Sequence, residues 1–145
     1  MIDKICIAIG ADHGGFELKE KIKEYFKDKI NFKDFGTNSK ESVDYPVIAY
    51  STAESVALNE TSCGIVICRT GVGVSIVANK VKGIRCALCY NKEVGHLCKE
   101  HNNANMIAIP ADMVTFEEAV EIINNWLNAA FLGGRHEKRV EMIEK

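Results

Sequence analysis

A cysteine, an arginine and two glycines follow one another at the end of an apolar run, in the segment ICRTGVGVSI. A glycine-bearing turn that leads from a strand into a helix directs its backbone N–H groups toward an anion or a developing oxyanion. A thiol at this turn, next to a cation, has its thiolate stabilised by the same groups. Cys68 is therefore a candidate base or nucleophile. The alternative is a buried strand-end thiol, with Gly71 and Gly73 used for tight turning and packing.

Three of the four histidines lie in predicted loops or at helix starts. His13 stands in ADHGG, His101 in KEHNNAN and His136 in GGRHEKR, and each is a candidate acid, base or anion-binding group. His96, in VGHLCKE, is typical of a helix surface.

Two arginines stand four residues apart near the end of the sequence. A helix places Arg135 and Arg139 on one face, where two guanidinium groups can bind one phosphate. The alternative is that they form ion pairs with Glu137 and Glu141 on a solvated helix.

Composition narrows the classes of partner. The chain has 145 residues, 47% of them hydrophobic, and a formal net charge of -2. The chain has no overall positive charge that would attract nucleic acid or an acidic membrane. Binding of a phosphorylated ligand therefore requires a local cluster of cationic side chains. No apolar run approaches the roughly 20 residues of a membrane span, and the first residues do not resemble a signal peptide. We expect a cytoplasmic protein with a small-molecule partner.

The six cysteines are spread through apolar segments. Cys86 and Cys89 form the only CxxC, but they fall in a predicted strand, where residues three apart point to opposite faces. They therefore cannot bind the same metal ion. Apart from Cys68, we expect the cysteines to act as small buried hydrophobic residues.

Five apolar runs predict buried strands that alternate with helices. This alternation predicts right-handed crossovers and a parallel sheet covered on both faces, within one domain of residues 1–145. Thr115 and Glu118 form a capping box for one helix, and a charged helix covers about 135–145. Apolar faces of two helices comprise Leu18, Ile22, Tyr25 and Phe26, and then Ala119, Ile122, Ile123, Trp126 and Ala130. The strands are expected at 5–10, 30–36, 64–68, 84–89 and 105–110.

In such a sheet, ligands bind outside the carboxyl ends of the strands. The segments that follow the predicted strands are ADHGG, GTNSKESVDYP, CRTGVG and YNKEVGHLCKEHNNAN. These segments hold the unusual chemistry of the sequence, which supports a site at this edge.

Several separate motifs then resemble one family, in the same order and over nearly the whole chain. They are GADHGGFELKE, DFGT, VDYP, GIVICRTGVGVSIVANKVKGIRCAL, KEHNNAN and GGRHEKRVEMI. The sequence is similar to the type B ribose-5-phosphate isomerases and their galactose-6-phosphate isomerase relatives. This resemblance implies a three-layer Rossmann-like sandwich, no metal and no cofactor, and a homodimer or homotetramer with sites at the dimer interface. It implies interconversion of ribose 5-phosphate and ribulose 5-phosphate, in the pentose phosphate pathway, through a cis-enediolate.

The resemblance assigns the reacting groups. Cys68 matches the base that moves a proton between C2 and C1, and Val74 occupies the place where some members have a glutamate. His101 matches the histidine that opens the sugar ring, with Thr70 nearby. Gly71 and Gly73 match the glycines whose neighbouring N–H groups bind the enediolate.

The binding residues follow from the same resemblance. Asp12 and Tyr45 match residues that contact the sugar hydroxyls, and Asn102 matches one that reaches the substrate beside the glycine loop. The phosphate-binding matches are His13, Arg135 and Arg139, with His136 in the same motif.

The sequence departs from the family pattern at two positions. Arg69 stands where members have glycine, and Asp112 stands where they have an arginine after the fifth strand. Three hypotheses follow: Arg69 replaces the lost cation in substrate binding, Arg69 pairs with Asp112 across the interface, or its bulk narrows the pocket and selects another sugar or abolishes activity.

Three alternative functions are kept. One is an isomerase of a six-carbon substrate, allose 6-phosphate or galactose 6-phosphate. Another is a non-catalytic sugar-phosphate-binding protein, which would retain Arg135 and Arg139 but tolerate loss of the base. A nucleotide-binding module suits the fold but lacks a complete GxGxxG, with Asp34 close to the place of its acidic residue.

Overall fold

The computed structural model describes residues 3–145 and contains one parallel sheet. Its strand order is β2-β1-β3-β5-β4, with all four neighbouring pairs parallel. The strands are β1 (Ile5–Ala11), β2 (Ile30–Asp34), β3 (Cys63–Cys68), β4 (Cys86–Leu88) and β5 (Met106–Pro110).

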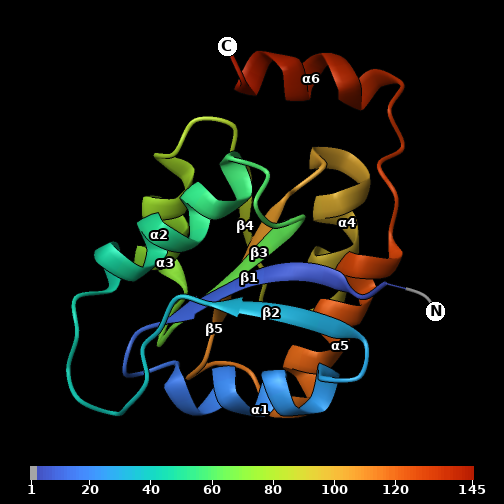
Figure 1. Cartoon of the computed structure of the whole chain (residues 1–145). Coiled ribbons are helices and arrows are strands. Elements are labelled where there is room, and N and C mark those ends of the chain that lie inside the picture. Colours follow the sequence, from blue (N-terminus) through green and yellow to red (C-terminus); the bar gives the residue numbers. More distant parts are fainter. Residues whose placement is uncertain (1–2) are drawn as a thin grey trace.

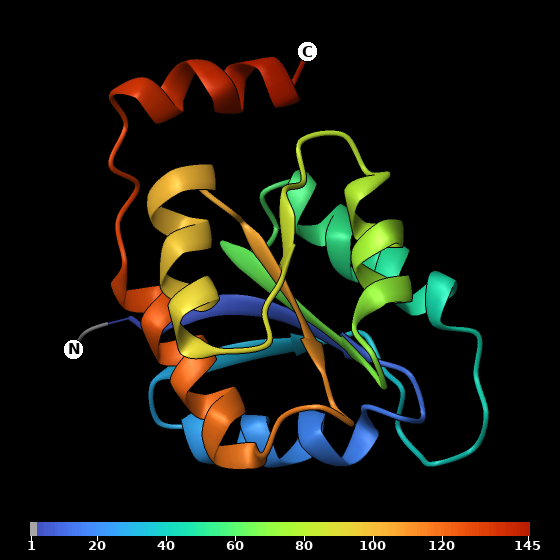
Figure 2. The same cartoon turned by 180° about the vertical axis from the view of Figure 1, so that it is seen from behind.

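Helices cover both faces of this sheet, so the predicted three-layer sandwich is confirmed (Figure 1). One face carries α2 and α3, and the other carries α1, α4 and α5; α6 lies apart from both layers (Figure 2). Within residues 3–145, no helix has the length and apolar character needed to cross a membrane. The helices are α1 (Phe16–Phe26), α2 (Tyr45–Ala57), α3 (Val72–Asn79), α4 (Lys92–Asn102), α5 (Phe116–Asn128) and α6 (Arg135–Ile143).

The central strands place large side chains on one face and small ones on the other. The side with α1, α4 and α5 buries the isoleucines at positions 7, 9, 65, 67, 107 and 109. The other side buries Ala8, Val66 and Ala108. This period-two alternation lets α2 and α3 lie closer to the sheet. A Cβ at Gly10 would stand 2.3 Å from the Thr52 hydroxyl oxygen, so this close approach requires glycine.

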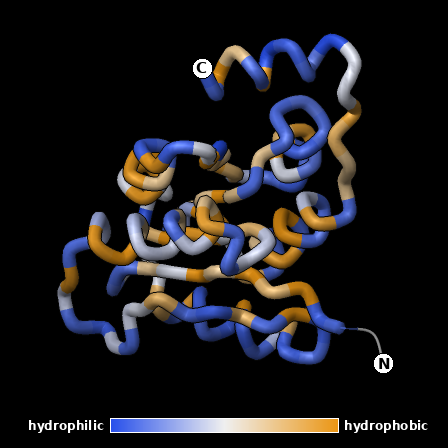
Figure 3. Tube along the Cα trace, turned by 45° about the horizontal axis from the view of Figure 1, so that its top comes forward, coloured by the Kyte–Doolittle hydropathy of each residue, from blue (hydrophilic) through white to orange (hydrophobic). Residues whose placement is uncertain are grey.

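The hydropathy of the segments differs between the sandwich and α6. Apolar residues gather in the strands and alternate with hydrophilic ones along the flanking helices, whereas α6 is mainly hydrophilic (Figure 3). Within α6, only His136 and Val140 are buried. Packing therefore stabilises the sandwich, and α6 is held through few buried side chains.

The structure corrects some predicted element limits. β2 ends at Asp34 instead of residue 36, and β4 covers only Cys86–Leu88 instead of 84–89. Before β4, the Arg85 N–H donates to the side-chain Oδ1 of Asn105, at 2.8 Å, in place of a regular strand partner. Because a side chain accepts the hydrogen bond here in place of a neighbouring strand, the apolar pattern of the sequence could not show where β4 begins.

Two residues predicted on apolar helix faces are exposed. α5 ends at Asn128, so Ala130 falls outside the helix and is exposed. Tyr25 is 57% exposed, although its ring packs edge-on against Phe26 and Phe116. The predicted capping box is confirmed: Thr115 accepts from the Glu118 N–H, and Glu118 accepts from the Thr115 N–H.

The cysteine predictions are largely confirmed. Cys86 lies in the core beside α2 and α3, whereas Cys89 lies in the core on the opposite face. Cys89 instead approaches Cys98, with 3.9 Å between the sulfur atoms. Burial raises the pKa of the Cys63 thiol to about 12. Cys6 is the exception to the predicted burial, since it is partly exposed.

A buried lysine joins α1 to the end of β2. Lys19 is fully buried, and its Nζ lies 2.6 Å from an Asp34 carboxylate oxygen. Lys23 donates to the same oxygen at 2.7 Å, and the Gly36 N–H donates to the other. Burial acts to raise the pKa of Asp34, but the hydrogen bonds from Lys19 and Lys23 outweigh it and hold that pKa below its ordinary value.

We predict that Asp34→Asn lowers the free energy of unfolding by about 1–3 kcal/mol at pH 7, because buried Lys19 then keeps only the more exposed Glu20 carboxylate, at 2.9 Å, as its counter-charge. The folded-state pKa of Asp34 is depressed from 3.8, so its stabilisation is present above about pH 4 and lost as pH falls through the folded value. Urea unfolding of both proteins at pH 7 and pH 3 measures this difference.

Exposed Asp28 provides the matched control, and Asp28→Asn should change stability by less than about 0.5 kcal/mol. An equal loss in Asp34→Asn at both pH values would contradict a charge-dependent role for Asp34.

Candidate active site

The residues predicted to bind the sugar and move the proton gather at the carboxyl ends of the central strands. The register pairs Ala11 with Ile67 and Cys68 with Pro110, so the residues after β1 lie next to the end of β3. The Asp12 N–H continues the pairing by donating to Ile67 O at 3.2 Å. We name these residues the carboxyl-end group: Asp12, His13, Tyr45, Cys68, Arg69, Thr70, Gly71 and Gly73.

The loop after β1 fixes two of these side chains. Asp12 is buried, and its Oδ1 accepts from the N–H groups of Gly14 and Gly15, at 2.9 and 3.1 Å. The other carboxylate oxygen has no such bond to the loop and is available to a hydroxyl. His13 accepts through Nδ1 from the Val43 N–H at 3.2 Å, which leaves Nε2 as the ring donor of the neutral tautomer.

The turn between β3 and α3 requires glycine at Gly71. This residue precedes α3 with φ +73°, in the left-handed region. A Cβ there would also stand 2.6 Å from the Leu88 Cδ1 and 3.3 Å from the backbone of Ile109. The tight-turning role considered for this glycine is therefore confirmed, and it sets the direction in which α3 leaves the sheet.

Gly73 permits Tyr45 to reach the same turn. A Cβ on Gly73 would lie 2.6 to 2.9 Å from the ring and hydroxyl atoms of Tyr45. Tyr45 begins α2, where Pro46 favours a helix start, and it is 38% exposed. Two segments distant in sequence are thus brought together, with the tyrosine hydroxyl beside the first turn of α3.

Cys68 lies beneath this turn. It is the last residue of β3, is 6% exposed, and packs with the core on the α2 and α3 side. The first turn of a helix leaves N–H groups without intrahelical partners, here including those of Gly73 and Val74. Thr70 is exposed, and its hydroxyl accepts from the Val72 N–H at 3.3 Å. The arrangement combines a thiol with unpaired backbone donors, which suits proton transfer beside a developing oxyanion.

A second set of predicted residues lies at the opposite end of the sheet. α4 runs back against the strands and ends just before β5 begins, so its last residues lie at the amino ends. His101 stacks on His136 of α6, with ring centroids 4.4 Å apart and an interplanar angle of 16°. We name this set the amino-end group: His101, Asn102, Arg135, His136 and Arg139.

The arginines of the amino-end group are available to a ligand. Arg135 and Arg139 are exposed, and within residues 3–145 neither forms an ion pair, so the predicted alternative of pairing with Glu137 and Glu141 is not found. Burial, together with the positive charges of the nearby His101 and both arginines, lowers the pKa of His136. His96 lies on the surface of α4 and pairs with Glu100 at 3.0 Å, as predicted for a surface histidine.

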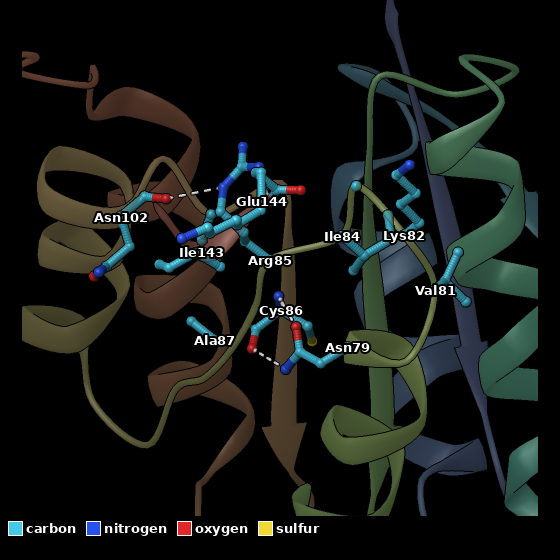
Figure 4. A pocket seen from close by; sticks show the side chains of 13 residues that line it. Asn79, Val81, Lys82, Ile84, Arg85, Cys86, Ala87, Asn102, Ile143 and Glu144 are labelled. Carbon is cyan, nitrogen blue, oxygen red and sulfur yellow. Dashed lines mark hydrogen bonds and ion pairs between the residues drawn. The ribbon is translucent and has the colours of Figure 1, made fainter. Parts of the chain in front are cut away.

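Arg85 is a supporting residue that the sequence reasoning missed. Its Nη1 lies 2.6 Å from Glu144, just after α6, and its Nε donates to the Asn102 carbonyl at 3.1 Å. A cavity of about 590 Å³ opens beside it, between the end of α6 and the α3–β4 connection (Figure 4). Cys68 does not line this cavity. The contact joins residues 59 positions apart, so no local pattern indicated it.

The two groups do not meet within one chain. The carboxyl-end group follows β1 and β3, with Tyr45 at the start of α2, whereas the amino-end group lies on α4 and α6 beyond the other edge of the same parallel sheet (Figures 1 and 2). The structure therefore brings Cys68 together with Asp12 and Tyr45 but not with His101 or Arg139.

One of the three hypotheses for Arg69, its pairing with Asp112, is found, but within the chain. The guanidinium Nη1 lies 3.6 Å from Asp112 Oδ2, and both side chains are more than half exposed. The sequence hypothesis placed this pair across an interface between chains. Neighbouring strand ends explain the correction, because the Asp112 N–H also donates to the Arg69 carbonyl at 2.9 Å.

A parallel sheet with a thiol, a carboxylate and a histidine at its carboxyl edge places the chain among the α/β proteins that act on small ligands. The model of the Ribose/Galactose Isomerase family matches residues 7–143, and the chain belongs to that family.

Individual relatives are similar to this chain over nearly its whole length. The ribose-5-phosphate isomerase B of Escherichia coli (strain K12) is 44% identical over 138 residues, covering 94% of this chain and 93% of that protein. A Clostridium thermocellum ribose-5-phosphate isomerase B structure has a TM-score of 0.95 and 46% identity, over 97% of this chain and 95% of the other. The enzyme from Mycoplasma genitalium, solved with bound ribulose-5-phosphate, has a TM-score of 0.93 and 40% identity, over 97% and 94%.

We predict that Gly73→Ala lowers kcat/KM by at least about tenfold, because the new methyl group displaces the Tyr45 ring from the turn and small misplacements at a site are costly. The clash involves the end of a movable side chain, so the free energy of unfolding should change by less than about 1 kcal/mol. Steady-state kinetics and urea unfolding measure the two effects.

Tyr45→Ala and the double variant complete this test. If the glycine acts through the tyrosine, the double variant should be no worse than Tyr45→Ala alone. Multiplicative losses in the double variant would show that Gly73 has a separate role.

Proposed function

We propose that the protein is an aldose–ketose isomerase that interconverts ribose 5-phosphate and ribulose 5-phosphate. The observation that carries this proposal is the placement of Cys68 beside Asp12 and the α3 turn in a chain with 40% identity to a structure holding ribulose-5-phosphate. The acid, base and binding groups required by the reaction are all present in the sequence.

The reaction proceeds by proton transfer between adjacent carbons. In the opened aldose, the Cys68 thiolate removes the proton from C2, and the electron pair forms the C1–C2 double bond while the C1 carbonyl oxygen becomes the enediolate oxyanion. Backbone N–H groups in the first turn of α3, at Gly73 and Val74, stabilise that oxyanion. Cys68 then returns the proton to C1 as the C2 carbonyl forms, and the proton of the C2 hydroxyl passes to the C1 oxyanion, which becomes the C1 hydroxyl of the ketose.

Four further residues of the carboxyl-end group bind the substrate. Asp12 has one oxygen fixed by the loop and offers the other to a hydroxyl. Tyr45 supplies a hydroxyl beside the glycine turn, and Thr70 lies at the same turn. His13, held through Nδ1, directs its Nε2 donor toward the phosphate.

A second copy of the chain completes the site. His101 opens the furanose ring, Asn102 contacts the substrate, and Arg135 and Arg139 bind the phosphate together with His136. These residues lie at the wrong end of their own sheet to reach their own Cys68. The proposed assembly is a homodimer or a pair of such dimers.

Exposed apolar side chains support this assembly. They lie on helices α2, α3 and α6, each of which carries part of the site or borders it. A second copy packed on these helices would bury surface that is unfavourable in water. The residues are Val47, Tyr50, Val72, Ile76, Met142 and Ile143.

The alternatives fit the described residues less well. Asp34, the candidate acidic residue of a nucleotide site, is already bound by Lys19 and Lys23 and is not free for a ribose. A non-catalytic binder has no requirement for the thiol placed beneath the α3 turn. An isomerase of a six-carbon sugar phosphate uses the same chemistry, and only assays with each substrate distinguish it from a ribose-5-phosphate isomerase. We propose a cytoplasmic location, as for an enzyme acting on a soluble metabolite.

We predict that the protein converts ribose 5-phosphate to ribulose 5-phosphate, and that Cys68→Ser lowers kcat by about 10²–10⁴-fold while substrate still binds, because a hydroxyl is a much weaker base than a thiolate. Turnover in deuterium oxide, followed by nuclear magnetic resonance, measures both the rate and deuterium incorporation at C1.

Cys6→Ser is the matched control, since Cys6 lies near the start of β1 and away from the carboxyl edge. It should retain wild-type kcat. Allose 6-phosphate and galactose 6-phosphate are assayed in parallel, and turnover of only one of these would replace the ribose substrate with a six-carbon one. Near-full kcat in Cys68→Ser would contradict Cys68 as the base.

A further inference from the structure

A second cavity, of about 430 Å³, lies at the carboxyl edge of the sheet on the side of α1 and α5. The loop after β1 forms one wall, and the residues that follow β3 and β5 form another. This cavity adjoins the carboxyl-end group, because His13 and Arg69 belong to both. The residues that line it include His13, Gly14, Lys21, Lys40, Arg69 and Asp112.

Two cationic side chains that line this cavity differ in how closely they pair with carboxylates of the chain. Lys40 forms a close ion pair with Glu17. Arg69 has only the longer contact of 3.6 Å to Asp112, and within residues 3–145 its guanidinium donates no hydrogen bond to a protein acceptor. Arg69 therefore retains the planar set of N–H donors that binds phosphate oxygens in a bidentate manner.

The arginine is held over the loop that binds the sugar. A Cβ on Gly14 would stand 2.5 Å from the Arg69 Cγ and 3.1 Å from its Nε, so the side chain lies directly across this glycine. The adjacent backbone is fixed as well, since the Ala111 N–H donates to the Cys68 carbonyl and the Asp112 N–H to the Arg69 carbonyl, both at 2.9 Å. The position of Arg69 thus depends on the same strand end that positions Cys68.

We propose that Arg69 binds the phosphate group of the substrate, from the same chain that supplies the base, and that Asp112 holds its guanidinium in place before substrate arrives. This inference rests on the proposed isomerase function. The side chains of Cys68 and Arg69 are adjacent along the chain but point into different surroundings, the core of the α2 side and the cavity respectively. One strand end then holds the reacting carbons and the remote phosphate of one small molecule.

Charge gives the pair a role in selecting the substrate. Asp112 is 51% exposed at the cavity, and without Arg69 its carboxylate would repel a phosphate dianion. With Arg69 present, the phosphate receives charge-assisted donors from Arg69 and the Nε2 donor from His13. A sugar without phosphate gains nothing from these contacts.

We expect Arg69→Met to raise KM for ribose 5-phosphate by about 10–100-fold with kcat changed by less than about threefold, because the lost contact is made equally in the ground and transition states. The Kd for inorganic phosphate, measured by calorimetry, should rise by a similar factor. Arg69→Lys should be intermediate, since it keeps the charge and loses the planar donors. Turnover of unphosphorylated ribose should be the same in all variants.

The double variant tests the part played by Asp112. In the Arg69→Met background, Asp112→Asn should recover a measurable part of the phosphate affinity, because an unpaired carboxylate no longer faces the anion. In the wild-type background, Asp112→Asn should change KM by less than about threefold. Lys29→Met, which removes an exposed charge beside the amino end of β2, controls for net charge.

The outcomes separate this proposal from the proposed function. If wild type isomerises ribose 5-phosphate and Arg69→Met leaves both KM and the phosphate Kd unchanged, the Arg69 proposal is wrong and the function stands. A wider range of accepted sugars with unaltered phosphate affinity would assign Arg69 to steric selection instead. If wild type turns over no sugar phosphate, the function fails, and phosphate binding by the two proteins still decides the role of Arg69. Additive effects of Arg69→Met and Asp112→Asn would contradict their coupling.

Discussion

The parallel direction of the five strands is the constraint on which the site depends. Every strand ends at the same edge, so the pairing of β1 with β3 brings the residues that follow both strands together there. Every returning helix ends at the other edge, and α4 accordingly delivers His101 and Asn102 to the amino ends. If the proposed chemistry uses both sets of residues, it requires two chains.

Close packing on one face of the sheet serves the same site. Small residues on that face let α2 and α3 approach, and Gly73 lets the first residue of α2 rest on the first turn of α3. The thiol, the helix N–H groups and the tyrosine hydroxyl therefore share one place. Arg69 lies beyond this packed region, over Gly14, where the edge is open and polar. Cys68 thus lies in the packed part of this strand end, and Arg69 lies in its exposed part.

The sequence predicted those features that depend on local patterns. Alternating apolar runs indicated the strands, and Gly71 and the Thr115 capping box marked helix starts that the structure confirms. The Lys19–Asp34 pair and the Arg85–Glu144 contact could not be predicted, because each joins segments whose proximity arises only from the fold. The separation of Cys68 from His101 could have been inferred, since a helix that precedes a parallel strand ends at that strand's amino end. A pairing of Arg69 with Asp112 was one of three hypotheses from the sequence, and its location within one chain could be seen only from the register of β3 and β5.

The central claim, that two copies build each active site, is tested most directly by hybrid complementation. Cys68→Ser removes the base from one edge, and Arg139→Ala removes a phosphate ligand from the other. Co-expression of two differently tagged chains, one carrying each substitution, produces hybrids in which one site combines two intact halves. After random pairing into dimers, kcat/KM per chain should recover to about a quarter of the wild-type value, because half of the dimers are hybrids with one working site of two. Activity no greater than the average of the two single variants, with hybrids verified by tandem affinity purification, would contradict the two-chain site.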